Sequence, residues 1–114
     1  MTTGDPAIER NVRAVHALLL RSDSGLQLID CREPDEFQIC RIEGARLVPL
    51  SKFPELIFEF LPDTDVLAGI YCHHGIRSIR AANFLRQRGY SQVFSMEGGI
   101  EAWSREIDPR VPRY

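Results

Sequence analysis

Residues 71–78 read YCHHGIRS and place a cysteine, two histidines, a glycine and an arginine within one short stretch. The stretch follows the apolar run 66–71 and precedes a helical pattern that begins at Arg77. A tight loop that leads into a helix can aim several backbone N–H groups at one point, where they bind an anion. A cysteine at that point is stabilised as a thiolate, which is the nucleophilic form of the side chain. We therefore predict that Cys72 is the reactive residue.

Gly75 and Arg77 strengthen this prediction. Gly75 permits a positive φ, or a close approach between the backbone and a bound ligand. Arg77 adds a permanently charged fork at the expected mouth, suited to an oxyanion or to the charge of a persulfide. Without these two residues, a cysteine after an apolar strand is more often a small buried side chain. The rest of the predicted active-site loop consists of His73, His74, Ile76 and Ser78.

The two adjacent histidines raise the question of a metal site. Neighbouring side chains are expected to diverge, and structural zinc sites use ligands at wider spacing, such as C-x₂-C with H-x₃-H. We therefore predict neither a metal nor another cofactor, and we expect His73 and His74 to tune the thiolate or shape the pocket. Cys31 and Cys40 lack a comparable loop. We expect structural or incidental roles for both, with a resolving thiol as the lesser alternative.

The elements around the loop alternate between strands and helices. The all-apolar run 66–71 is typical of a central strand that is covered on both faces. Alternation of this kind predicts an α/β fold with a mainly parallel sheet. The polar strand ends at 30–32 and 72–78 are then expected to share one crevice beyond the carboxyl ends of the strands. Strand patterns cover 26–29, 45–50, 66–71 and 92–95, and helical patterns cover 12–19 after an N-cap at Asn11, 33–37, 53–60, 77–88 and 98–105.

Composition narrows the class of protein. The 114 residues fit one domain, and a chain that is 44% apolar and 26% charged is typical of an ordinary globular protein. A net charge of −2 provides no general basic surface for nucleic acid. No apolar run is long enough for a signal peptide or a membrane span, so we expect a cytoplasmic protein without a membrane partner. The three cysteines are expected to be reduced thiols.

Taken together, these motifs resemble the single-domain rhodaneses, sulfurtransferases that carry sulfur as a cysteine persulfide. YCHHGIRS resembles the active-site loop of that family, and the segments LIDCREPDEF, IEGARLVPL and EGGIEAW are similar to its other motifs. The resemblance covers most of residues 26–105 in the family's order and leaves 106–114 as a tail. There are two departures: Cys40-Arg41 stands where Gly-His is usual, and Cys31 stands where an apolar residue is common.

The resemblance implies one rhodanese-like domain over residues 1–114, with a three-layer fold in which helices flank a five-stranded, mainly parallel sheet. It also implies that Cys72 takes sulfane sulfur from a small anionic donor such as thiosulfate. The persulfide would then pass its sulfur to cyanide, a thiol or a protein. The resemblance likewise implies that Asp30 and Arg32 support the loop or face it.

Two other functions stay open beside a thiosulfate sulfurtransferase. A phosphatase or arsenate reductase of related fold also brackets an anion-binding loop with Cys and Arg, but the loops that resemble this one place five residues between them. Four residues separate Cys72 from Arg77, which leaves less room for a phosphoryl group than for one sulfur atom. The alternative from another class is a rhodanese-like regulatory or sulfur-carrier module. The presence of Cys72, Gly75 and Arg77 favours the enzyme.

Overall fold

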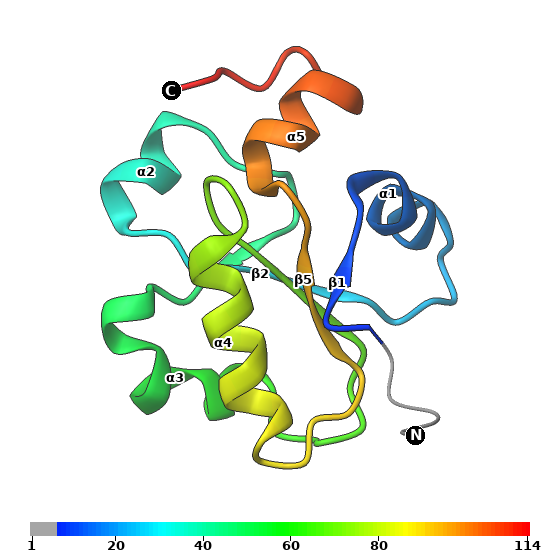
Figure 1. The fold of residues 1–114 in the computed structure, drawn as a ribbon, viewed down its shortest axis with the longest axis vertical. Coiled ribbons are helices and arrows are strands. Elements are labelled where there is room, and N and C mark those ends of the chain that lie inside the picture. The colour runs from blue at the N-terminus through cyan, green and yellow to red at the C-terminus, as the bar shows by residue number, and fades with distance from the viewer. Residues whose placement is uncertain (1–6) are drawn as a thin grey trace.

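A computed structural model describes residues 7–114 and contains a five-stranded sheet in which every neighbouring pair runs parallel (Figure 1). The order across the sheet is β1-β5-β4-β2-β3. The central strand β4 is buried along its whole length, as the apolar run predicted. Residues 1–6 of the predicted domain lie outside the described residues. The strands are β1 (Glu9–Arg10), β2 (Gln27–Asp30), β3 (Arg46–Leu47), β4 (Ala68–Tyr71) and β5 (Val93–Met96).

The helices lie close to the predicted segments. Asn11 caps the first one, because its side chain accepts a hydrogen bond from the backbone N–H of Ala14. Within residues 7–114, no helix is long and apolar enough to cross a membrane. The α-helices are α1 (Val12–Leu20), α2 (Pro34–Ile39), α3 (Phe53–Phe60), α4 (Ile76–Arg86) and α5 (Gly99–Glu106), and the short 3₁₀ helix η1 (Leu50–Lys52) precedes α3.

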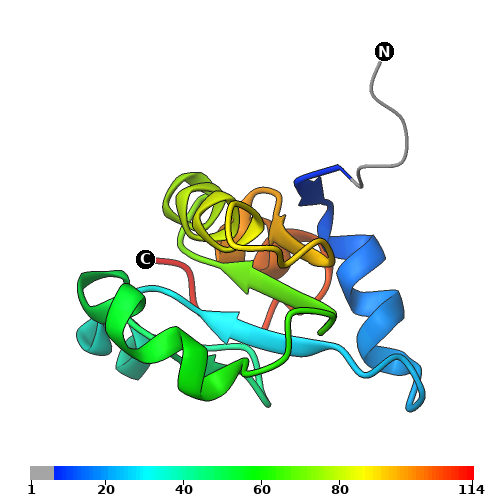
Figure 2. The same ribbon diagram turned by 90° about the horizontal axis from the view of Figure 1, so that it is seen from below.

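The helices cover both faces of the sheet, so the predicted three-layer α/β fold is confirmed. Helices α3 and α4 lie on one side and α1 on the other (Figures 1 and 2). Side chains alternate along each strand, which divides the core into two clusters. One cluster joins Ile29, Ile70 and Val93 to Ile57 and Leu85, and the other joins Leu28, Tyr71 and Phe94 to Val15, Ile100 and Trp103.

Two strands differ from their predictions. Strand β1 was not predicted, because a strand of two residues is too short to show an alternation of apolar and polar side chains. Strand β3 is shorter than the predicted 45–50. Pro49 has no backbone N–H to donate to a neighbouring strand, and the chain turns directly into η1. Both strands lie at the edges of the sheet, away from the carboxyl end of β4.

Candidate active site

Cys72 directly follows β4, and its side chain lies inside the loop that leads to α4. The residue is 1% exposed. Its Sγ accepts hydrogen bonds from the backbone N–H groups of Gly75 at 3.1 Å and Ser78 at 3.4 Å. The N-terminus of α4 adds the positive end of its dipole on the same side. The predicted nest of backbone N–H groups around Cys72 is therefore present.

Gly75 has the positive φ that the sequence predicted, at 99°, and is the N-cap of α4. A Cβ on this residue would also lie 3.0 Å from the backbone nitrogen of Gly98. The close approach that requires glycine is thus between two loops of the protein itself. The positive φ and the close approach to Gly98 both require glycine at this position of the N–H nest.

Two buried serines extend the hydrogen bonding of Cys72. The Ser78 hydroxyl lies 3.4 Å from Cys72 Sγ and 2.7 Å from the Ser95 hydroxyl. Because a thiolate can only accept, Ser78 donates to Cys72 and Ser95 donates to Ser78. Sequence reasoning missed Ser95, although a polar residue inside the apolar strand β5 was a signal for it.

The pKa of Cys72 is lowered from its ordinary value to about 4. The largest cause is a hydrogen bond from the Cys31 thiol, which outweighs burial, and the bonds from Ser78 and Gly75 add to it. The same contact, together with burial, raises the pKa of Cys31, so Cys31 keeps its proton. Cys72 is consequently the thiolate at neutral pH. Cys31, for which a structural or incidental role was expected, lies beside it.

Helix α5 holds the loop from the other side. The backbone N–H groups of Ile100 and Glu101 donate to the carbonyl oxygens of Cys72 and His73 at 2.9 and 3.1 Å. Gly99 has a φ of 63°, and a Cβ there would collide with both of these carbonyls. The Gly-Gly pair in the EGGIEAW segment therefore serves the active-site loop.

Arg77 lies at the start of α4 and forms a two-pronged ion pair with Glu36. Its two terminal nitrogens donate to the two carboxylate oxygens at 2.8 and 2.9 Å. These bonds are the largest cause that lowers the pKa of Glu36 to about 2. The fork that the sequence predicted for an anion is thus engaged by a carboxylate of α2. Sequence reasoning missed Glu36, and its position in the first turn of a capped helix gave no hint of a partner 41 residues away.

Asp30 and Arg32 form a buried ion pair behind the loop. Both side chains are 0% exposed, and Arg32 Nη2 donates to Asp30 Oδ2 at 2.6 Å. Arg32 also donates to the backbone carbonyls of Glu36 and Cys40, at 3.3 and 2.6 Å. The resemblance implied that these residues either support the loop or face it. The geometry fits the supporting role, because Arg32 holds the backbone of α2 in place, and α2 carries Glu36.

The two histidines of the loop do not diverge, so that expectation was wrong. Their rings stack with centroids 4.0 Å apart, and the Tyr114 ring stacks on His73 at 3.8 Å. The tail adds this third ring, which favours the stacked arrangement. Burial and the nearby His74 lower the pKa of His73. Within residues 7–114, no group of three His, Cys, Asp or Glu side chains is arranged to hold a metal ion.

The tail contributes a residue that sequence reasoning did not find. The Tyr114 hydroxyl accepts a hydrogen bond from Arg32 Nη1 at 2.9 Å and donates to Glu36 Oε2 at 2.8 Å.

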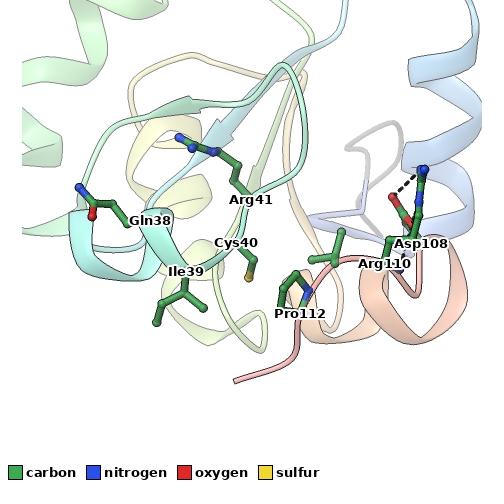
Figure 3. Close-up of a pocket in the computed structure, with 8 residues that line it drawn as sticks. Gln38, Ile39, Cys40, Arg41, Asp108, Arg110 and Pro112 are labelled. Atoms are coloured by element: carbon green, nitrogen blue, oxygen red, sulfur yellow. Dashed lines mark hydrogen bonds and ion pairs between the residues drawn. The ribbon is translucent and has the colours of Figure 1, made fainter.

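Two other features lie outside these contacts. Ile76, which the predicted loop includes, points to solvent and is 71% exposed. A separate hollow of about 390 Å³ lies between the end of α2 and the tail (Figure 3). Its lining includes Cys40 and Pro112 but none of the predicted site residues.

Comparison with known proteins shows which family the chain belongs to. The sequence pattern of the family described as "Rhodanese-like domain" matches residues 14–106. The chain belongs to this family. A sulfurtransferase of Allochromatium vinosum is 40% identical to it over 84 residues, which cover 74% of this chain and 77% of that protein. The crystal structure of a rhodanese-related protein from Thermoplasma volcanium has a TM-score of 0.78 and 28% identity, and the match covers 95% of this chain and 100% of that one.

Some relatives of this rhodanese-like domain are much longer. The Rhodanese-like/PpiC domain-containing protein 12, chloroplastic, of Arabidopsis thaliana is 37% identical over 92 residues. The match covers 77% of this chain but 30% of that protein. The chain therefore spans less than a third of that relative's length. Other relatives, such as the Allochromatium vinosum protein, are named sulfurtransferases.

Proposed function

We propose that this rhodanese-like domain moves sulfane sulfur from a small anionic donor such as thiosulfate to a thiophilic acceptor, through a persulfide on Cys72. The observation that carries the proposal is the cradle around Cys72 Sγ, in which Gly75 and Ser78 donate backbone N–H groups to the sulfur. A cysteine held in this way is a nucleophile at neutral pH. Its loop also begins at the carboxyl end of the central strand, where sites of α/β proteins lie.

The proposed reaction has two halves. In the first, the Cys72 thiolate attacks the outer sulfur of thiosulfate, a new S–S bond forms, and sulfite leaves with the electrons of the broken S–S bond. In the second, cyanide, a thiol or a protein nucleophile attacks the outer sulfur of the persulfide, and the Cys72 thiolate leaves. The donors that hold the thiolate also stabilise it as the leaving group of the second half.

The proposal requires persulfide formation that depends on Cys72. Incubation with thiosulfate is expected to add one sulfur atom to the wild-type chain, measured by intact mass, and cyanide is expected to remove it with release of thiocyanate. Cys72→Ser should neither gain sulfur nor turn over. Cys40→Ser is the matched control, because Cys40 lies outside the cradle, in the core cluster on the opposite face of the sheet. Equal sulfur gain in Cys72→Ser would overturn the proposal.

The same assay separates the two alternatives. A phosphatase would hydrolyse an aryl phosphate in a reaction that Cys72→Ser abolishes. A carrier module would gain sulfur from thiosulfate but fail to transfer it to cyanide. Ile76 is the feature that supports a protein acceptor, because this large apolar side chain is 71% exposed beside the loop.

A further inference from the structure

Cys31 and Cys72 occupy equivalent positions on neighbouring strands. Each directly follows its strand, and the last paired residues of β2 and β4 are Asp30 and Tyr71. The Cys31 N–H donates to the Tyr71 carbonyl at 3.0 Å, which is the bond that pairs Cys31 with Cys72 in a parallel ladder. Neighbouring strands lie about 4.8 Å apart. That separation is within the range of about 4.4–6.8 Å over which two Cα atoms can be joined by a disulfide.

Both thiols point to the same face of the sheet. Side chains alternate along a strand, so Cys31 shares the face of Ile29 and Cys72 shares the face of Ile70. All four belong to the one core cluster that packs under α3 and α4. Each thiol also shifts the pKa of the other, which agrees with this placement. The two cysteines are thus in register and on one face, within the same core cluster.

The third cysteine has a different environment. Cys40 belongs to the core cluster on the opposite face of the sheet. Its Sγ lies 3.9 Å from Arg32 Nη1 and faces the hollow between α2 and the tail (Figure 3). The sheet therefore separates Cys40 from Cys72, and only Cys31 of the two other cysteines is placed to react with it.

We propose that Cys31 is the resolving thiol of Cys72 and forms a disulfide with it after a hydroperoxide has oxidised Cys72. In the first step the Cys72 thiolate attacks one peroxide oxygen, the O–O bond breaks, and Cys72 becomes a sulfenic acid. The leaving alkoxide or hydroxide takes a proton from water and departs as an alcohol or as water. In the second step Cys31 Sγ attacks Cys72 Sγ and the S–O bond breaks. The departing hydroxide takes up the proton of Cys31 and leaves as water.

The first step also activates the second cysteine. The largest cause that keeps Cys31 protonated is its hydrogen bond to Cys72, and the negative charge of Cys72 adds to it. A sulfenic acid is neutral, so oxidation removes this charge and lets Cys31 lose its proton more readily. The disulfide then protects Cys72 from the irreversible sulfinic and sulfonic acids. A dithiol reductant returns both thiols and is itself oxidised to a disulfide.

The disulfide can be identified by peptide mapping, because trypsin separates the three cysteines. Cys31 falls in residues 22–32, Cys40 in 33–41 and Cys72 in 53–77. After treatment of the full chain with hydrogen peroxide and alkylation of free thiols, we expect peptide 22–32 linked to 53–77, with 33–41 alkylated. Dithiothreitol should abolish the link. Absence of the link in the wild-type chain, or a link to 33–41 instead, would overturn the proposal.

Variants test the role of Cys31 in protecting Cys72. In Cys31→Ser and Cys31→Ala, peroxide should convert Cys72 to forms with two or three added oxygen atoms, which dithiothreitol does not remove. The control Cys40→Ser should form the 22–32 to 53–77 link as the wild type does. Equal over-oxidation of Cys72 in the wild type and in both Cys31 variants would contradict the proposal. If neither variant folds, the wild-type map alone decides. None of these measurements uses thiosulfate, so the result is independent of sulfur transfer.

Discussion

At the scale of single residues, Cys72 owes its lowered pKa to donors rather than to a neighbouring base. Gly75 and Ser78 donate to its sulfur and Cys31 lowers its pKa further, whereas the histidine rings of the loop stack on each other and on Tyr114. A thiolate that is stabilised by neutral donors is present without a protonated histidine. Its reactivity should therefore follow one titration over a wide pH range.

The pH dependence of Cys72 alkylation tests whether the reactivity follows a single titration. With a pKa near 4, the iodoacetamide rate of Cys72 should be flat through neutral pH and should fall to half at about pH 4. The sign follows from the lowered pKa, since only acid below that value protonates the sulfur. Cys31→Ala removes the largest cause of the lowering, so its half-point should move to higher pH. A wild-type rate that rises steadily between pH 7 and the ordinary thiol value of about 8.5 would contradict the prediction.

Glu36 and Arg77 make a second prediction at this scale. Glu36 occupies the fork that would otherwise attract an anionic donor. Glu36→Gln removes the competing charge and should lower the KM for thiosulfate about fivefold, since a partly exposed pair is worth about 1 kcal/mol. Arg77→Ala should raise that KM. Steady-state kinetics at two salt concentrations are the measurement, because salt weakens both effects. Unchanged KM values in both variants would mean that the pair is only structural.

Residue types and spacing predicted the conformation of the loop around Cys72 but not the distant residues that contact the loop. Cys72, the positive φ of Gly75 and the N–H nest follow from a short loop between a strand and a helix, and this is local geometry. Glu36 and Ser95 come from elements far away in the chain. Only the packing of α2 and β5 beside the loop brings them to it, and no local pattern specifies that packing.

At the scale of elements, the site is assembled where three elements meet: the end of β4, the start of α4 and the start of α5. Helix α5 binds the carbonyl oxygens of the loop, which turns the N–H groups of the same loop towards Cys72. Gly99 is the position that allows this approach. The loop geometry is therefore as dependent on α5 as on its own sequence.

Gly99→Ala tests this dependence. The new Cβ would collide with the carbonyls of Cys72 and His73 and would require a left-handed conformation of alanine, at a combined cost of roughly 2–5 kcal/mol. Gly25→Ala is the matched control, because Gly25 has a similar φ of 70° but nothing within 4 Å of the added Cβ. It should lose about 1–2 kcal/mol. Denaturant unfolding and Cys72 alkylation are the measurements, and equal losses in the two variants would contradict the role of the close approach.

The element pattern was largely predictable, because amphipathic helices have a helical spacing of apolar residues and the central strand is a continuous apolar run. The family resemblance gave the number of strands, but the order of the strands was not predicted, since periodicity does not say which strands are neighbours. The two edge strands, β1 and β3, were predicted least well. Strand β1 has two residues, and its register is set by pairing with β5 rather than by its own sequence.

At the scale of the whole molecule, the tail that follows α5 returns to the predicted site. Tyr114 contacts Arg32, Glu36 and His73, which lie just after β2, on α2 and in the predicted active-site loop. The sequence predicted residues 106–114 only as a tail. Its contacts are made by a hydroxyl and a ring with no periodic pattern around them, so only the folded structure identifies them.

Tyr114→Phe isolates the hydrogen bonds of the tail, since it keeps the ring that stacks on His73. The buried guanidinium of Arg32 loses one acceptor and Glu36 loses one donor, so the free energy of unfolding should fall by about 1–2 kcal/mol. Arg113→Ala is the control from the same tail, because the exposed side chain of Arg113 pairs with Glu101 outside this network, and it should leave stability unchanged. Denaturant unfolding of both variants decides the matter. A Tyr114→Phe variant as stable as the wild type would show that the tail rests on the site without stabilising it.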